Sequence, residues 1–119
     1  MIIQKLKKVI PVRHTMFNKL THGKPYRFKN WKMDHNGQEC LYYEFNGTKG
    51  RRHSKRIPIS EIKAAATYLK QNNVFDRTTF NAICPIASSG GPCSFAVLGR
   101  CLEYLGLATY QGRGKGFAL

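Results

Sequence analysis

The sequence predicts an α+β fold, in which an antiparallel β-meander is followed by three helices and a C-terminal β-hairpin. Three observations predict it. Between residues 26 and 59, aromatic and basic residues alternate and are separated by turn signals, as in antiparallel strands. After Ser60 the apolar residues take a helical spacing. After Gly106 two short runs flank a glycine-rich turn.

The meander is expected to contain three strands. The first begins at Tyr26 and ends before the tetrapeptide DHNG at residues 34–37, which is typical of a hairpin turn. The second covers residues 40–45, and the third covers residues 52–59. Alternation places Arg52, Ser54 and Arg56 on one face of the third strand and Arg51, His53 and Lys55 on the other. Because neither set suits a core, we expect an edge strand. The pattern of residues 2–11 does not distinguish a helix from a strand.

The first predicted helix starts at Ser60, which is a suitable N-cap, and ends near Asn72. Its apolar face repeats at helical spacing and consists of Ile62, Ala65, Ala66 and Leu69. We expect Asp76 to cap a second short helix that holds Phe80 and Ile83 and that Pro85 ends.

The third predicted helix begins near Pro92 or Cys93 and stops at Gly106. Its expected buried face consists of Phe95, Leu98, Leu102 and Leu105. Residues 107–110 and 117–119 then predict a hairpin around the segment QGRGKG.

The charge balance indicates the partner. The 119 residues include 20 Lys or Arg and 6 Asp or Glu, for a net charge of +14. Residues 1–59 carry 14 of these cations and 3 of the acids, so the charge belongs to the basic N-terminal segment and not to residues 60–119. The two halves are expected to pack as one unit. Such an excess is tolerated mainly beside an anionic partner, so nucleic acid leads and an anionic membrane surface comes second.

Localisation follows from what the sequence lacks. The longest apolar stretch, residues 94–110, is interrupted by Arg100 and Glu103 and is too polar to span a membrane. The N-terminus mixes lysines into its apolar residues and has no small-residue cleavage site, which argues against a signal peptide. We therefore expect a cytoplasmic protein that does not enter the membrane.

The sequence gives little indication of a catalytic site, a cofactor site or a metal site. The spacing of Cys40, Cys84, Cys93 and Cys101 fits no zinc template, so we expect reduced thiols. The six acids form no cluster suited to two-metal chemistry. We expect a binding protein without a cofactor and without enzymatic activity.

The strongest binding candidate is the segment KGRRHSKR at residues 49–56. Its cations can follow a phosphate backbone and release counterions from it; they are Lys49, Arg51, Arg52, Lys55 and Arg56. The plain structural alternative is a solvated edge strand. The cations Arg113 and Lys115 in the C-terminal turn are a second candidate, with an ordinary β-turn as the alternative.

Residues 58–119, about half of the chain, resemble a winged helix-turn-helix domain. The resemblance rests on a helix that ends in EYLGL, a short strand, a basic glycine-rich tip and an aromatic return strand. It implies that the third helix enters the major groove of DNA and that the hairpin, or wing, touches the backbone or the minor groove. By position it nominates Ser94, Val97, Arg100 and Tyr104 on the outer face of that helix, with Arg113 and Lys115 at the wing tip. Arg100 is the one cation of this helix, which also lacks Asn and Gln, so we expect duplex DNA binding with modest sequence preference.

Two other functions remain open. In one, the aromatic and basic sheet binds single-stranded nucleic acid or RNA, with Trp31 as a surface stacking residue. In the other, the winged helix is a protein-interaction module whose docking patch contains Val97 and Tyr104. No dimerising helix is evident, so we expect a monomer or a weak homodimer.

Overall fold

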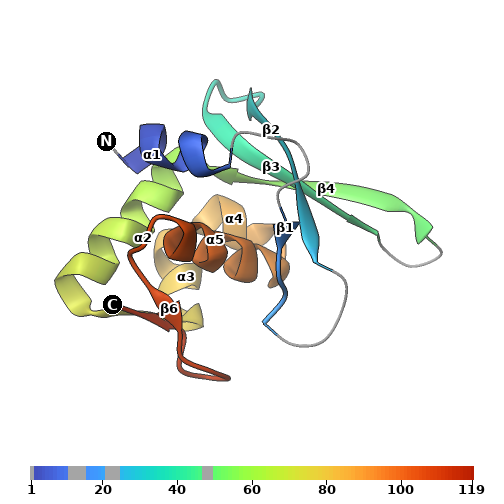
Figure 1. Ribbon diagram of the computed structural model, residues 1–119. Coiled ribbons are helices and arrows are strands. Elements are labelled where there is room, and N and C mark those ends of the chain that lie inside the picture. Colours follow the sequence, from blue (N-terminus) through green and yellow to red (C-terminus); the bar gives the residue numbers. More distant parts are fainter. Residues whose placement is uncertain (1, 11–15, 21–24, 47–49) are drawn as a thin grey trace.

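Two antiparallel sheets and five helices make up the computed structural model, which describes all residues except 1, 11–15, 21–24 and 47–49 (Figure 1). The large sheet has the strand order β1-β2-β3-β4, with β1 at Met16–Phe17, β2 at Tyr26–Met33, β3 at Glu39–Asn46 and β4 at Arg52–Pro58. The small sheet has the order β5-β7-β6, with β5 at Val74–Phe75, β6 at Thr109–Tyr110 and β7 at Phe117–Ala118. The helices are α1 (Ile2–Val9), α2 (Ile59–Asn72), α3 (Arg77–Ile83), α4 (Pro85–Ser89) and α5 (Cys93–Tyr104). The predicted α+β class is confirmed.

The β2–β3 hairpin follows the predicted turn. Asp34 Oδ1 accepts the backbone N–H groups of Asn36 and Gln38, each at 2.9 Å, and Gly37 adopts the left-handed conformation that glycine favours (φ 77°). This local chemistry explains why the turn was predictable from four residues.

A β-bulge in β2 explains the irregular spacing of its aromatic residues. The register shifts between Phe28 and Asn30, so Trp31 returns to the face of the sheet that Phe28 occupies. Trp31 pairs with Leu41, and Leu41 pairs with Ile57 on β4; the last two are fully buried. This face of the sheet packs toward the helices.

The helices begin and end close to their predicted positions, with two differences. Ser60 is not the N-cap of α2, because Pro58 ends β4 in extended backbone and the helix starts at once at Ile59. Pro85 does more than end α3, because it is the first residue of an additional helix, α4. Four helices, and not three, therefore follow β4 in a region that is described throughout. The expected cap at Asp76 is present, with Oδ1 accepting the N–H of Thr79 at 2.9 Å.

One hydrophobic core joins residues from both halves of the chain. Leu41, Tyr43 and Ile57 from the large sheet pack in the same cluster as the predicted apolar faces of α2 and α5. In α5 the expected buried residues Phe95 and Leu98 are indeed buried. Within the described ranges, no helix has the length and apolar character needed to cross a membrane.

Candidate nucleic-acid interface

All six acidic side chains lie among the described residues, and each is engaged within the molecule. Four form ion pairs: Asp34 with Arg56 (3.2 Å), Glu39 with Lys7 (2.7 Å), Glu44 with Arg27 (3.7 Å) and Glu103 with Arg100 (2.7 Å). The other two cap helices by accepting backbone N–H groups: Asp76 from Thr79, and Glu61 from Ile86 and Ala87. None of the six carboxylates is thus without a partner inside the molecule, while most of the described cations have no carboxylate partner.

The predicted basic segment lies at the start of β4, which is an edge strand as expected. Arg51 and Arg52 are exposed, and neither forms an ion pair with any other described residue. Arg52 pairs in register with Asn46 at the end of β3. Lys49 lies outside the described residues. The two arginines are therefore free to contact an anionic ligand.

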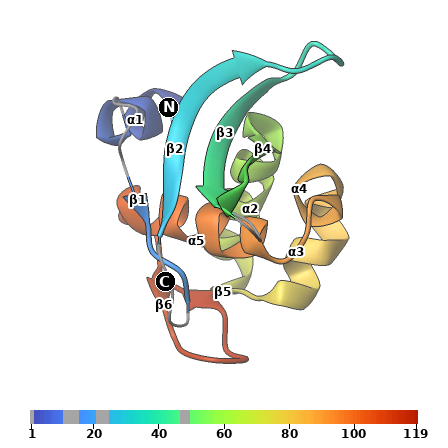
Figure 2. The ribbon, with the colours of Figure 1, turned by 90° about the vertical axis from the view of Figure 1, so that its right-hand side faces the viewer.

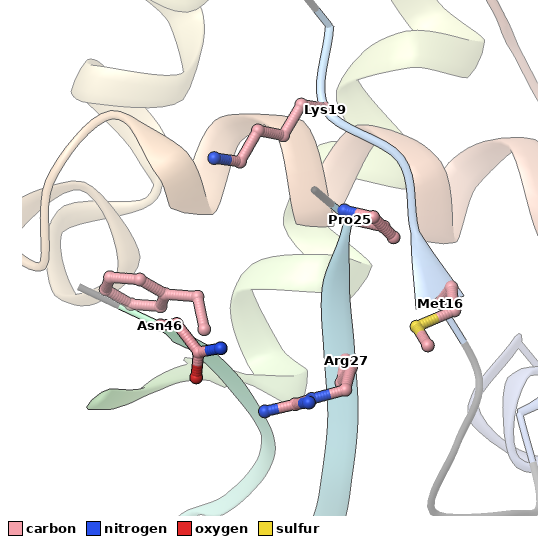
Figure 3. A pocket seen from close by; sticks show the side chains of 6 residues that line it. Met16, Lys19, Pro25, Arg27 and Asn46 are labelled. Carbon is pink, nitrogen blue, oxygen red and sulfur yellow. The ribbon is translucent and has the colours of Figure 1, made fainter. Parts of the chain in front are cut away.

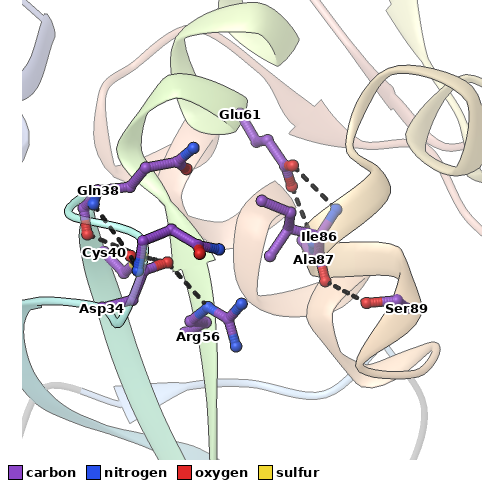
Figure 4. A network of polar contacts seen from close by, with 9 residues as sticks. Asp34, Gln38, Cys40, Arg56, Glu61, Ile86, Ala87 and Ser89 are labelled. Atoms are coloured by element: carbon purple, nitrogen blue, oxygen red, sulfur yellow. Dashed lines mark hydrogen bonds and ion pairs between the residues drawn. The ribbon is translucent and has the colours of Figure 1, made fainter.

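Lys55 and Arg56, from the same segment, have partners in the molecule. The Lys55 ammonium lies 5.3 Å from the centre of the Phe45 ring and 3.3 Å from Cys93 Sγ at the start of α5. Arg56 bonds to the turn carboxylate Asp34 (Figure 4). Both side chains are half-buried, so they hold the sheet in place as well as contributing charge.

The predicted outer face of α5 is wrong for its first two residues. Ser94 and Val97 are fully buried. The hydroxyl of Ser94 lies 2.7 Å from that of Tyr43, so the large sheet packs on the face that was expected to meet DNA. The resemblance covered only residues 58–119, and the sheet that buries this face comes from the other half of the chain.

The other two nominated residues of α5 bind β1 and the segment after it. Arg100 donates to the carbonyl oxygens of Asn18 (3.0 Å) and Lys19 (3.3 Å), and the Tyr104 hydroxyl donates to the carbonyl of Met16. Insertion of α5 into a major groove would require these contacts to break. The proposed docking patch of Val97 and Tyr104 is likewise not formed.

Trp31, which was expected at the surface, is half-buried and makes structural contacts. Its indole N–H donates to the carbonyl of Ile10 at 3.4 Å, and its ring packs against Phe28. Lys7 covers the ring at 5.6 Å. These contacts cover part of the ring, so less of it is open to a base than the predicted surface position would offer.

The β6–β7 hairpin presents the second pair of predicted cations. Arg113 and Lys115 are exposed in a turn closed by the bonds Gln111 N–H to Gly116 O (2.9 Å) and Lys115 N–H to Gly112 O (3.0 Å). Figure 2 shows the end of β3 above α5 and this hairpin below it. Arg51 and Arg52 near the start of β4 and Arg113 and Lys115 in this hairpin thus form two separate exposed cation pairs.

Three pockets that share lining residues extend from Asn46, the register partner of Arg52, to Arg113. Figure 3 shows the first, which is lined by Met16, Lys19, Pro25, Arg27, Phe45 and Asn46. The second shares Lys19 with the first, and the third shares Leu20 and Arg77 with the second and ends at Arg113 and Gly114. We call these three pockets the cationic groove. The sequence did not single out Lys19 or Arg77, because neither belongs to a cluster of basic residues or to a motif.

The four cysteines are free thiols in different surroundings. Burial and the neighbouring Asp34 raise the pKa of Cys40 to about 11, and burial and Glu61 raise the pKa of Cys84 to about 12. Burial also raises the pKa of Cys101. Cys93 differs because it is half-buried and lines the second pocket of the cationic groove.

Comparison with known proteins does not assign a function, so the proposal below depends on the geometry of this site. No protein-family model, curated protein or solved structure matches the chain.

Proposed function

We propose that this protein binds nucleic acid, with duplex DNA as its ligand, and that it contacts phosphates through Arg51 and Arg52 on β4 and through Arg113 and Lys115 on the β6–β7 hairpin. One observation carries the proposal. All six Asp and Glu side chains bind groups within the molecule, whereas these exposed cations have no carboxylate partner among the described residues. A surface of this kind attracts a polyanion and gains free energy as counterions leave the phosphates.

The contacts are proposed to position the protein on the backbone without reading bases. Two features support this. The face of α5 that would enter a major groove is covered by the large sheet, and phosphate contacts carry no sequence information. We therefore expect weak sequence preference, well below that of a protein with a free recognition helix.

A duplex is favoured over a single strand because stacking surfaces are scarce. Trp31, the main aromatic candidate for stacking single-stranded bases, is half-buried and held by Ile10 and Phe28, which restricts stacking on its ring. On the solvent face of the large sheet, Tyr42 is half-buried between its register partners Asn30 and Arg56.

We further propose that residues 59–119 form a winged-helix unit in which the β6–β7 hairpin is the wing. The small sheet supports this, since its order β5-β7-β6 brings the strand after α2 against the returning strand of the hairpin. In this proposal the wing keeps its backbone contact, while α5 serves as scaffold. The function is binding without catalysis, because the acids serve separate structural contacts and leave no carboxylate cluster for metal-assisted hydrolysis.

Fluorescence anisotropy with labelled duplex DNA, single-stranded DNA and hairpin RNA tests the proposal. Salt is titrated from about 50 to 200 mM, the range over which phosphate-dominated binding weakens steeply. We expect preference for the duplex. The double variant Arg51→Ala with Arg52→Ala should lower the salt slope by about two, roughly one for each lost phosphate contact.

A matched control removes the same charge elsewhere. Lys63 and Lys70 are exposed on α2, which lies at the opposite side of the molecule from the end of the β3–β4 hairpin (Figure 1). Their double alanine variant should keep the wild-type slope. Equal losses in both double variants would mean that net charge alone drives binding, and no binding of any nucleic acid at low salt would refute the proposed function.

A further inference from the structure

The cationic groove joins the two sites to which we assign phosphate contacts. Its first pocket has a volume of about 200 Å³ and includes Asn46, the register partner of Arg52 on β4. The second pocket, of about 240 Å³, and the third, of about 460 Å³, continue past the start of α5 to Arg113. A polymer lying along the groove would therefore contact Arg113 at one end and pass beside Arg52 at the other.

Two cations inside the groove are positioned by aromatic rings. Lys19 Nζ lies 5.2 Å from the centre of the Tyr26 ring, and the Arg77 guanidinium lies 4.7 Å from the centre of the Phe95 ring. Neither forms an ion pair with any residue in the described ranges. Because a ring orients a cation without neutralising its charge, both remain available to an anion.

One acid lines the groove, and another pairs with a lining residue. Asp76 lines the third pocket, but its Oδ1 accepts the N–H of Thr79 as the cap of α3. Glu44 pairs with Arg27 at 3.7 Å, so Arg27 is partly neutralised and contributes less than Lys19 and Arg77. Cations thus outnumber acids among the lining residues of each of the three pockets.

Two of the four aromatic residues that line the groove, Tyr26 and Phe95, offer little room for bases. Tyr26 is buried and its ring packs edge-on against Tyr43 and Phe45. Phe95 is buried among Phe75, Phe80 and Phe117. With these rings engaged in the core, the groove suits the charge of a backbone better than the flat surface of a base.

We propose that the cationic groove holds the phosphodiester backbone of one nucleic-acid strand, with Lys19 and Arg77 contacting phosphates between Arg52 at one end and Arg113 at the other. This inference rests on the proposed function and adds the path of the strand. It also explains why the protein can bind DNA while the face of α5 stays covered by the large sheet.

The reactivity of the Cys93 thiol can be used to test whether a ligand covers the groove in the wild-type protein. It is half-buried in the second pocket, whereas the other three cysteines are fully buried. Alkylation with iodoacetamide, followed by peptide mass spectrometry, should modify Cys93 first. We expect a 20-base-pair duplex to slow this reaction at least tenfold at concentrations that saturate the anisotropy signal.

Substitutions supply a second, independent readout. Lys19→Gln and Arg77→Gln should each weaken duplex binding severalfold at low salt and lower the salt slope by about one, while Lys63→Gln on α2 leaves both unchanged. Arg77→Gln removes the contact between Arg77 and the Phe95 ring and could disturb folding on that account. In that case Lys19→Gln alone tests the proposal. Circular dichroism confirms that each variant is folded.

The outcomes separate this inference from the proposed function. Suppose that the duplex binds fully, that it does not slow alkylation of Cys93, and that both glutamine variants bind like the wild type. The strand would then lie elsewhere, which would overturn the groove proposal and leave nucleic-acid binding intact. No anisotropy change with any nucleic acid would overturn both.

Discussion

The hydroxyl groups of Tyr43 and Ser94 lie 2.7 Å apart in the core, where they connect β3 to the first turn of α5. The two residues are 51 positions apart in the chain. Through this contact the large sheet covers a helix face that would be exposed if residues 59–119 stood alone. The position of the sheet, and with it the way the protein can meet a ligand, depends on this interface.

Removing the Tyr43 hydroxyl should destabilise the protein. Tyr43→Phe leaves the buried Ser94 hydroxyl without this partner, at a cost of about 1–3 kcal/mol in the free energy of unfolding. Urea denaturation followed by circular dichroism measures the change. Tyr42→Phe, on the half-exposed opposite face of β3, is the control and should change the midpoint little.

Gly99 should not tolerate alanine. In a free helix this substitution stabilises by roughly 0.5–1 kcal/mol, but here the Phe117 ring occupies the position that the Cβ would take. We expect a loss of about 1–3 kcal/mol from overpacking, seen as a lower melting temperature. Gly90→Ala is the matched control. The atom nearest to the Cβ that alanine would add there is the Ala87 carbonyl oxygen at 3.4 Å, and the φ of Gly90 is −77°. Equal melting temperatures for the two variants would contradict this packing.

Glu61 should contribute strongly to stability because it caps α4 from a different helix. Its two oxygens accept the N–H groups of Ile86 (2.9 Å) and Ala87 (2.8 Å), and the side chain is buried (Figure 4). Glu61→Ala should therefore cost about 1.5–3 kcal/mol by urea denaturation. Glu39→Ala breaks only the exposed pair with Lys7 and should cost at most about 1 kcal/mol. A cost for Glu61→Ala no larger than for Glu39→Ala would argue against the cap.

Asp34 should make stability fall in acid. The backbone N–H groups of Gln38 and Asn36 hold the pKa of this carboxyl below its usual value of 3.8, and Cys40 and Arg56 add to the effect. A lowered pKa in the folded state means that the contribution is fully present above the unfolded pKa and is lost as pH falls below about 4 toward the folded value. Urea midpoints measured from pH 6 to pH 2.5 should fall less steeply for Asp34→Asn than for the wild type in the acid range. Parallel curves would show that Asp34 does not contribute to the acid sensitivity.

Much of the secondary structure could be predicted because its causes are local. The Asp34 turn, the Asp76 cap and the apolar face of α5 each depend on residues within a few positions of one another. Of the candidate site, Arg51, Arg52, Arg113 and Lys115 were predicted and are exposed, as the charge argument requires. The outer-face positions assigned to Ser94 and Val97 were wrong, because burial by a distant segment leaves no trace in local spacing.

The sequence by itself determined the α+β class, the order of most elements and the excess of positive charge, since periodicity, turn chemistry and composition act over short stretches of chain. The tertiary structure alone decided that the large sheet covers α5, that Glu61 caps α4, and that Lys19 and Arg77 line one groove. These outcomes arise from contacts between residues 25 or more positions apart. The physical reason is that burying apolar surface and satisfying polar groups select among many ways to pack the same elements, and that selection depends on the whole chain at once.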